Sequence, residues 1–269
     1  MSTKDTAFTG SVPGIYEAHL VPLIFQPYAE DLARRLAPHR PARVLEIAAG
    51  TGVVTRALSA ALPRAAIVAT DLNQAMLDQA ASIGAGRNVR WQRADAQKLP
   101  FPDASFDAVV IQFGVMFFPD KARAHREARR VLKAGGTYLF NVWDALDDNE
   151  IPKAVHDSVA ALFPQNPPAF LARTPHGYHD RRAIARDLAA GGFGQPSDIA
   201  TVTARSKAPT AASPALGFTQ GTPLRSEIEE RDATRLQQAT DAAATAIATR
   251  FGPGPVDGKI QALVVSVRG

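Results

Sequence analysis

The sequence predicts an α/β fold, in which an open and mostly parallel sheet is covered by helices. Between residues 43 and 142, short apolar segments rich in Val, Ile and Leu alternate with longer amphipathic segments. Strands that alternate with helices of this length form parallel βαβ units. The first apolar segment also runs into a glycine-rich turn at 48–52, and sheets of this kind bind ligands beyond the carboxyl ends of their strands.

The elements follow from the same alternation. Strands are expected at 43–48, 66–70, 89–93, 106–112 and 137–142, and helices at 52–62, 73–82 and 120–132. Gly135 and Gly136 suit the end of the last helix, where a residue with positive φ is needed. The loops after the strands should converge on one site, and they are 48–52, 71–73, 95–97 and 112–117.

Outside this segment the alternation stops. Residues 14–39 are predicted to form a helical arm interrupted at Pro22 and Pro27, because proline removes a helix hydrogen bond. Further helices are expected at 149–163, 180–191 and 223–250, and further strands at 198–204 and 260–267. We expect a helical lid at 1–40, a ligand-binding core at 41–144, and the remaining core strands with lid helices at 145–269.

Composition narrows the function classes. The chain of 269 residues is 46% hydrophobic and 21% charged, as globular proteins usually are. It has no apolar run of the roughly 18–20 residues that span a bilayer, and it starts without a basic-then-apolar signal layout, so a cytoplasmic protein without a membrane span is expected. The chain contains no cysteine, which excludes disulfides, thiolate metal sites and a cysteine nucleophile.

The basic residues do not form a nucleic-acid pattern. The net charge of +4 comes from Lys and Arg residues that are mixed with Asp and Glu along amphipathic segments. Such mixing is typical of solvated helix faces. No dense spacing of His and Asp indicates a metal site, and none is expected.

The turn Glu46-Ile-Ala-Ala-Gly50-Thr-Gly52 is the first candidate for ligand binding. A strand that enters a helix through such a turn offers backbone N–H groups and room for close approach. The dinucleotide fingerprint G-x-G-x-x-G fits poorly because Thr55 occupies its third glycine position, and no Gly-Lys-Ser/Thr follows as in a phosphate loop. Asp71 ends the second strand, where a carboxylate can accept hydrogen bonds from both hydroxyls of a ribose.

Taken together, these segments resemble class I S-adenosylmethionine (SAM) dependent methyltransferases, most closely the ubiquinone/menaquinone-type, methyltransferase domain 11-like branch that acts on small molecules. The resemblance covers roughly 8–142. The matching pieces are Val44-Leu-Glu-Ile-Ala-Ala-Gly-Thr-Gly52, Thr70-Asp71-Leu-Asn-Gln-Ala-Met76, Ala94-Asp95-Ala96 with Leu99-Pro-Phe101, Phe106-Asp107-Ala-Val, and Arg129-Arg-Val-Leu-Lys-Ala-Gly-Gly136. The resemblance implies a Rossmann-like, mostly parallel sheet of about seven strands with helical lid insertions. It also implies methyl transfer to an O, N, S or C atom of a small molecule, with S-adenosylhomocysteine (SAH) as the product.

The resemblance assigns the turn to the methionyl part of the cofactor. Glu46 would hold the loop and contact the amino group, directly or through water. The backbone of Ala48 and Gly50, together with Thr51 and Gly52, would enclose the methionyl chain. Ala48 departs from the family, which has its first motif glycine there, and the added methyl group is tolerated if φ is negative.

Other positions would contact the rest of the cofactor. Asp71 would bind the ribose hydroxyls, although it also suits a helix N-cap. Asp95 would accept the adenine amino group, although it also suits a turn. The remaining assignments are Leu72 and Met76 against the adenine, the Ala96 N–H on a ring nitrogen, Gln112 and Phe113 near the sulfonium, and Tyr16 in an N-terminal lid. The other interpretation of Leu72 and Met76 is that they are core residues, and that of Tyr16 is that it packs on the sheet.

No motif identifies a catalytic residue. Methyl transfer mainly requires alignment of the acceptor and exclusion of water. His176 and His179 in a lid loop, and His19, are candidate general bases because imidazole titrates close to working pH, but surface or structural roles remain open. The aromatic residues Phe113, Phe117, Phe118 and Trp143 could form an acceptor pocket, attract the sulfonium or pack in the core.

Three other function classes are weighed against a methyltransferase acting on a small molecule. An NAD(P) oxidoreductase would have a small residue at Thr55 and a Tyr-x-x-x-Lys pair, and the sequence has neither. A nucleic-acid methyltransferase would carry an Asn/Asp-Pro-Pro-Tyr/Phe motif after the fourth strand, where the chain reads Gln112-Phe-Gly-Val. A non-catalytic SAM-binding or regulatory protein remains open. The protein is expected to be a monomer or a homodimer.

Overall fold

The computed structural model describes residues 10–194 and 198–269. The start of the predicted lid, including Phe8 and Thr9, lies outside these residues. No helix in the described part is long and apolar enough to cross a membrane. The chain divides into two units, which we call the sheet unit (26–142, 178–202 and 263–269) and the helical unit (10–25, 143–177 and 203–262). The domain division predicted at 40 and 144 is a different partition and stays a prediction.

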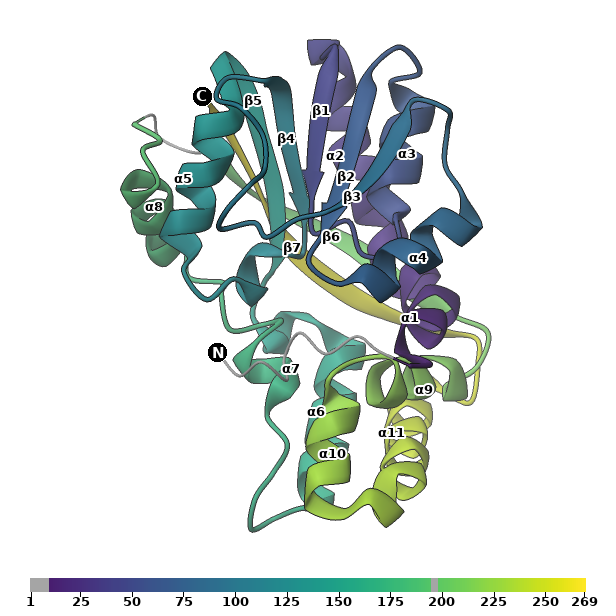
Figure 1. The fold of residues 1–269 in the computed structure, drawn as a ribbon. Helices are drawn as coiled ribbons and strands as arrows, with labels where there is room; N and C mark the ends of the chain where they lie inside the picture. The colour runs from purple at the N-terminus through teal and green to yellow at the C-terminus, as the bar shows by residue number, and fades with distance from the viewer. Residues whose placement is uncertain (1–9, 195–197) are drawn as a thin grey trace. The chain divides into compact units, whose positions relative to one another are not determined.

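A seven-stranded sheet forms the framework of the chain, in the order β3-β2-β1-β4-β5-β7-β6 (Figure 1). The first five strands pair in parallel. Gly135 on β5 donates to the carbonyl of Gly269, and Asp144 at the end of β5 donates to that of Gln261, so β7 runs antiparallel to β5. The predicted fold class is confirmed. The strands are β1 (Arg43–Ile47), β2 (Ala66–Asp71), β3 (Val89–Arg93), β4 (Phe106–Gln112), β5 (Leu132–Trp143), β6 (Asp198–Ala208) and β7 (Val256–Arg268).

Apolar runs place the central strands in the core. Every residue of β1 after Arg43 is buried, and so is every residue of β4 except Asp107. Continuous burial of this kind is typical of parallel strands with both faces covered. The helices of the sheet unit are α2 (Gln26–Leu36), α3 (Val53–Ala61), α4 (Gln74–Ile83), α5 (Lys121–Val131) and α8 (Arg181–Ala190). Helix α2 packs on α3, and α5 packs on α8 (Figure 1).

Side-chain caps define where several helices begin. The carboxylate of Asp120 accepts the N–H of Arg123 at α5, and that of Asp180 accepts the N–H of Arg182 at α8. Asn73 accepts the N–H of Ala75 at the start of α4. Such caps satisfy N–H groups that have no partner inside the helix.

Three predicted features of the elements are wrong. Neither predicted interruption of the arm occurs. Pro22 lies inside a π-helix, Tyr16–Phe25, and Pro27 is the second residue of α2, which follows directly; a π-turn absorbs the missing helix bond of Pro22. Gly135 has φ +72° but lies within β5, four residues beyond the last residue of α5, at the irregular start of that strand. The helix expected at 223–250 is broken at 233–235, where Asp232 caps the N–H of Thr234.

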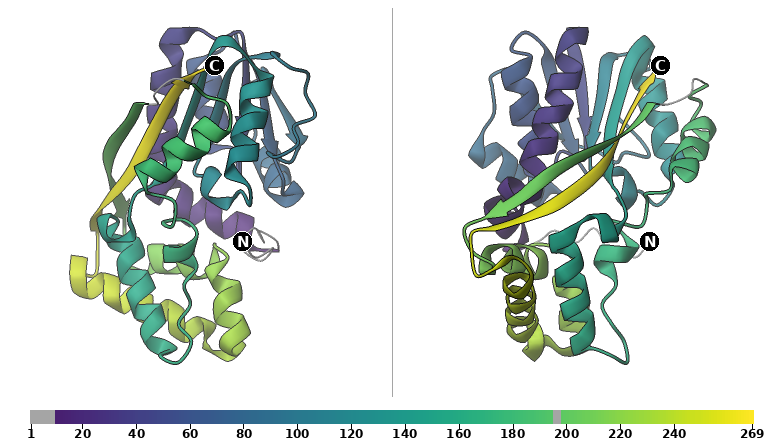
Figure 2. Two further views of the ribbon diagram at one scale, coloured as in Figure 1. Left: turned by 90° about the vertical axis from the view of Figure 1, so that its left-hand side faces the viewer. Right: turned by 180° about the vertical axis from the view of Figure 1, so that it is seen from behind.

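The helical unit consists mainly of helices. Its helices are α1 (Val12–Ile15), α6 (Glu150–Leu162), α7 (Phe170–Arg173), α9 (Ala212–Gln220), α10 (Leu224–Asp232) and α11 (Leu236–Phe251). Helix α11 packs on α6 and α9, with Ala239 and Ala243 buried. Gly217 of α9 leaves room for Leu20, because a Cβ on this glycine would lie 2.9 Å from the leucine. Figure 2 shows these helices from two further sides.

A buried histidine links α5 to β5 in the sheet unit. The ring of His125 is fully buried, and its Nδ1 lies 2.9 Å from the hydroxyl of Tyr138. Its Nε2 has no hydrogen-bond partner among the described residues. Gly191 at the end of α8 packs directly on this side chain, since a Cβ there would lie 2.5 Å from Cβ of His125. Burial lowers the pKa of His125 from 6.5 to about 4. The charge of Asp187 raises this pKa, and the charge of Lys121 lowers it.

His125 should make the stability of the protein depend on pH. In the unfolded chain its imidazole takes up a proton near pH 6.5, and in the folded chain only near pH 4, so the unfolded state binds more protons between these values. The neutral imidazole of His125 therefore contributes fully to stability above pH 6.5, and this contribution is lost as the pH falls toward 4. Between pH 7 and pH 5, the free energy of unfolding should fall about 2 kcal/mol more in the wild type than in His125→Phe. Urea denaturation measures this difference, and parallel pH profiles would contradict it.

Candidate functional site

The parallel register brings the ends of three strands to one edge of the sheet unit. Ile47 of β1 lies opposite Thr70 of β2 on one side and Ile111 of β4 on the other. The loops that follow these strands are therefore neighbours. Direct contacts join them: the N–H of Gly50 donates to Asp71 at 2.9 Å, and Gly114 approaches Ala48 so closely that an added Cβ would lie 2.6 Å from the alanine Cβ.

Asp71 holds two loops through its carboxylate. Its Oδ2 accepts the N–H of Gly50 at 2.9 Å, and its Oδ1 accepts the N–H of Asn73 at 2.8 Å. Burial raises the pKa of Asp71, while the hydrogen bonds from Asn73 and Gly50 oppose this rise. The side chain remains partly exposed. Each carboxylate oxygen can accept a further hydrogen bond, which leaves capacity for a ligand hydroxyl.

The turn after β1 uses glycine where other residues would be strained or would clash. Gly50 has φ +57° and Gly52 has φ +85°, values that favour glycine. A Cβ on Gly52 would lie 2.7 Å from the indole of Trp91, whereas one on Gly50 would meet only the end of Met76 at 3.8 Å. The hydroxyl of Thr51 is buried and has no hydrogen-bond partner among the described residues. A buried hydroxyl without a partner is costly and is suited to receive a ligand.

The methyl group of Ala48 was expected to be tolerated if φ is negative, and the structure does not meet this condition. Its φ is +57° rather than negative, in the left-handed region that costs a residue with a side chain roughly 1–2 kcal/mol. Strain of this size concentrates at functional sites. The contact with Gly114, in the loop after β4, places the strained residue between two of the converging loops.

The substitution Ala48→Gly should relieve this strain. Glycine costs about 0.5–1 kcal/mol of backbone entropy and removes about 1–2 kcal/mol of strain, so we expect the free energy of unfolding to rise by about 0.5–1 kcal/mol. Ala104→Gly is the matched control, because Ala104 has φ +47° in a loop before β4. Both variants should be stabilised in urea denaturation. A loss of stability in Ala48→Gly alone would contradict the assigned strain.

A second strained residue lies in the loop after β4. Phe113 has φ +48°, and its N–H donates to both the carbonyl and the side-chain Oδ1 of Asn141, at 3.2 and 2.9 Å. Its ring packs edge-on against Tyr28 at 5.3 Å. Sequence reasoning missed Asn141, although a polar residue within a buried strand was a usable signal. Gln112 lies beside Asn141 in the β4–β5 register and is buried.

Glu46 is buried at the end of β1 and is only 1% exposed. Its Oε2 accepts the hydroxyl of Thr55 at 2.6 Å. Burial raises the pKa of Glu46 to about 8; the hydrogen bond from Thr55 and the charge of Arg56 lower it, and the charge of Asp71 raises it. The carboxyl group is therefore mostly protonated at neutral pH. Thr55 was seen in the sequence only as a departure from a dinucleotide motif, and its partner became visible in the structure.

The residues predicted to contact an adenine follow β2 and β3, with Met76 in the first turn of α4. Leu72 is 51% exposed, an unusual exposure for an apolar side chain next to a strand end. Met76 and Ala96 are buried, and Asp95 is exposed. One carboxylate oxygen of Asp95 accepts the N–H of Gln97 at 2.8 Å. Asp95 therefore stabilises the turn after β3, and its second oxygen can accept a hydrogen bond from a ligand.

Other predicted residues are placed in the helical unit. The ring of Tyr16 stacks on Phe25 at 4.9 Å, and Nδ1 of His19 lies 3.0 Å from the hydroxyl of Ser213. Trp143 lies 6.0 Å from Phe25 and equally far from His176, measured between ring centroids. Tyr16, Phe25, Trp143 and His176 therefore form one row within the unit.

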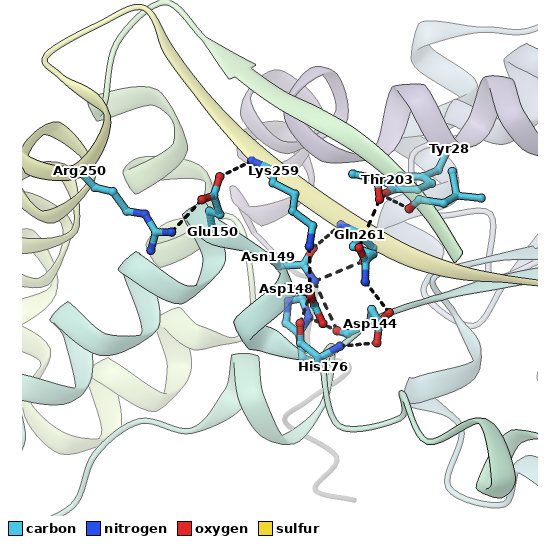
Figure 3. Close-up of polar contacts among 12 residues, drawn as sticks. Tyr28, Asp144, Asp148, Asn149, Glu150, His176, Thr203, Arg250, Lys259 and Gln261 are labelled. Carbon is cyan, nitrogen blue, oxygen red and sulfur yellow. Dashed lines mark hydrogen bonds and ion pairs between the residues drawn. The ribbon is translucent and has the colours of Figure 1, made fainter. Parts of the chain in front are cut away.

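His176 has a defined tautomer. Its Nδ1 lies 2.8 Å from the carbonyl oxygen of Asp144, which can only accept, so Nδ1 carries the proton and Nε2 the lone pair in the neutral ring. Figure 3 shows Asp144 held in turn by Gln261, whose side-chain amide donates to the Asp144 carboxylate at 2.9 Å, and by the buried Asn149. His179, by contrast, is exposed in the sheet unit.

No group of three or more His, Asp or Glu side chains in the described part of the chain is arranged to hold a metal ion. The candidate site comprises the loops after β1, β2, β3 and β4, with the strand ends before them and the start of α4. The residues predicted to bind a cofactor lie in these segments, except Tyr16. Their roles stay predictions.

Known proteins resemble this chain in the part that contains these loops. Residues 45–140 match a family model described as a methyltransferase domain. The ubiquinone/menaquinone biosynthesis C-methyltransferase UbiE of Pseudomonas aeruginosa is 40% identical over 127 residues, which cover 45% of this chain and 50% of that protein. The chain thus spans about half the length of the curated relatives it matches.

Solved structures share the fold over most of the chain. The YcgJ protein of Bacillus subtilis superposes with a TM-score of 0.56 at 24% identity, covering 90% of this chain and 98% of its own. The phosphoethanolamine N-methyltransferase 2 of Haemonchus contortus, in complex with S-adenosyl-L-methionine, superposes with a TM-score of 0.61 at 17% identity, covering 99% of this chain and 60% of its own. At these identities the likeness shows the fold alone.

Proposed function

We propose that this chain transfers the methyl group of SAM to a small-molecule acceptor, because residues 45–140 match a family model described as a methyltransferase domain. The observation that carries the proposal is the hydrogen bond from Gly50 to Asp71. It joins the glycine turn after β1 to the acid at the end of β2. A dinucleotide site is disfavoured, because Thr55 fills the third glycine position and bonds to Glu46.

The residues present fit the cofactor. The unpartnered buried hydroxyl of Thr51 and the positive-φ turn around Gly50 offer polar contacts and space to a methionyl chain. Asp71 retains acceptor capacity for the ribose hydroxyls, and the exposed Leu72 offers an apolar surface to the adenine. When bound, SAM supplies an electrophilic methyl group on its sulfonium.

The chain itself has to align the acceptor with the methyl group, exclude water from the site and accept a proton where the acceptor loses one. The left-handed Phe113, fixed by Asn141, supplies a buried apolar side chain after β4. Of the candidate bases, His176 has its Nε2 lone pair set by the bond to Asp144, as a general base requires. The roles of His176, His179 and His19 are part of the proposal. The acceptor class follows from resemblance to enzymes of small molecules, and phenols, quinols, amines and thiols are the candidates.

A labelled-methyl screen tests the proposal. The protein is incubated with methyl-labelled SAM and panels of the four acceptor classes, and products are identified by mass spectrometry. We expect at least one panel to acquire label, and Asp71→Ala to abolish the signal. SAM binding without transfer to any panel would instead favour a regulatory SAM-binding protein.

A further inference from the structure

The carboxyl group of Glu46 is held by Thr55. Its Oε2 accepts the Thr55 hydroxyl at 2.6 Å, and the backbone of Thr55 also forms a hydrogen bond with this carboxyl group. Thr55 is fully buried in the first turn of α3, directly beyond the glycine turn. A hydroxyl at this place rotates to donate, and it fixes the plane of the carboxyl group.

The surroundings of Glu46 disfavour a negative charge. Its strand neighbours are the apolar Ala69 on β2 and Val110 on β4. The charged groups acting on it are Asp71 at the end of β2 and Arg56 on α3, with opposite effects. Burial is the largest cause of its raised pKa, so a proton resides on the carboxyl group at neutral pH while the site holds no cation.

We propose that Thr55 is a positioning residue of the cofactor site, whose hydroxyl orients the carboxyl group of Glu46 so that this group receives the ammonium group of the cofactor. The inference rests on the proposed function. The proton balance is simple: the Glu46 carboxyl group releases its proton to solvent, and the resulting carboxylate pairs with the ligand ammonium, which keeps its own protons. Cofactor binding is thereby linked to the loss of one proton.

Two variants of Thr55 distinguish the effect of its hydroxyl from the effect of its side-chain volume. Thr55→Val keeps the volume and removes the donor, and Thr55→Ser keeps the donor. Thr70→Val is the matched control, because Thr70 is equally buried and its hydroxyl donates to the main-chain carbonyl of Glu46 at 2.8 Å, not to its carboxyl group. Circular dichroism and thermal scans confirm that each variant folds.

Titration calorimetry with SAH, between about pH 6 and pH 9 in two buffers of different ionisation enthalpy, provides the readout. In the wild type, affinity should rise about tenfold per pH unit up to about pH 8, with release of close to one proton at pH 7. Thr55→Val should weaken binding roughly tenfold and shift the profile to higher pH. Thr55→Ser and Thr70→Val should keep the wild-type profile, which a purely structural role of Thr55 would not predict.

The outcomes distinguish this inference from the proposed function. If the wild type does not bind SAH, the proposed function fails and the inference with it. If the wild type binds SAH without releasing a proton, or if Thr55→Val keeps its affinity and pH profile, only the inference is overturned. Should Thr55→Val not fold, the proton count in the wild type and the profile of Thr55→Ala decide the matter.

Discussion

Replacing Asp71 by alanine should strongly weaken cofactor binding. The carboxylate is expected to accept both ribose hydroxyls, and hydrogen bonds to a charged group contribute about 1.5–3 kcal/mol each. We therefore expect SAH affinity to fall by a factor of roughly 100 or more. The same change removes the bonds that Gly50 and Asn73 donate to this carboxylate, so the turn after β1 also loses its anchor.

The control is a carboxylate outside the site. Asp78 lies on the exposed side of α4, where it accepts a hydrogen bond from the side chain of Gln74. Asp78→Ala should leave SAH affinity unchanged within a factor of about two, because exposed side-chain contacts contribute little. Isothermal titration of both variants gives the comparison. Equal affinity in Asp71→Ala and the wild type would show that this acid does not bind the ribose.

Replacing Gly52 by alanine should strongly destabilise the sheet unit. The left-handed conformation costs a side chain roughly 1–2 kcal/mol, and the new methyl group would overlap the indole of Trp91, 2.7 Å away. Overpacking in a core costs a further 1–3 kcal/mol or so. We therefore expect the free energy of unfolding to fall by about 3 kcal/mol in urea denaturation.

Two further variants isolate the clash. Gly192 has φ +89° with nothing within 4 Å of an added Cβ, so Gly192→Ala should show the cost of the conformation alone. Trp91→Phe removes the clashing ring atoms, and in a double-mutant cycle it should restore about half of the stability lost in Gly52→Ala. A loss of the same size in Gly52→Ala and Gly192→Ala would mean that Trp91 does not constrain the turn.

The local pattern of apolar residues predicted the parallel strands well. The central strands β1 and β4 are buried on both faces, so their sequences are rich in apolar residues. The bounds of β3 and β4 agree with the prediction, and those of β1 and β2 differ by one residue. Elements stabilised by distant partners were harder. Pro22 is accommodated in a π-helix, and Gly135 pairs with Gly269 at the other end of the chain, and neither environment is visible from neighbouring residues.

The candidate site shows the same limit. The acids Glu46 and Asp71 were identified from motif spacing, but their hydrogen-bond partners were not. Thr55 and Asn141 act through contacts across 9 and 28 positions of the chain, and sequence periodicity does not encode such pairs. Backbone strain at Ala48 likewise depends on φ, which the residue type alone leaves open.

Hydrogen exchange of the wild-type protein with and without SAH, read by mass spectrometry, tests whether the cofactor binds at the ends of β1, β2, β3 and β4. We expect slower amide exchange in the loops 48–52, 71–73, 95–97 and 112–117, with the largest effect at the glycine turn. Bound ligand slows the local opening that exposes amides to exchange. Protection confined to other parts of the chain, or no protection at saturating SAH, would contradict cofactor binding at these strand ends.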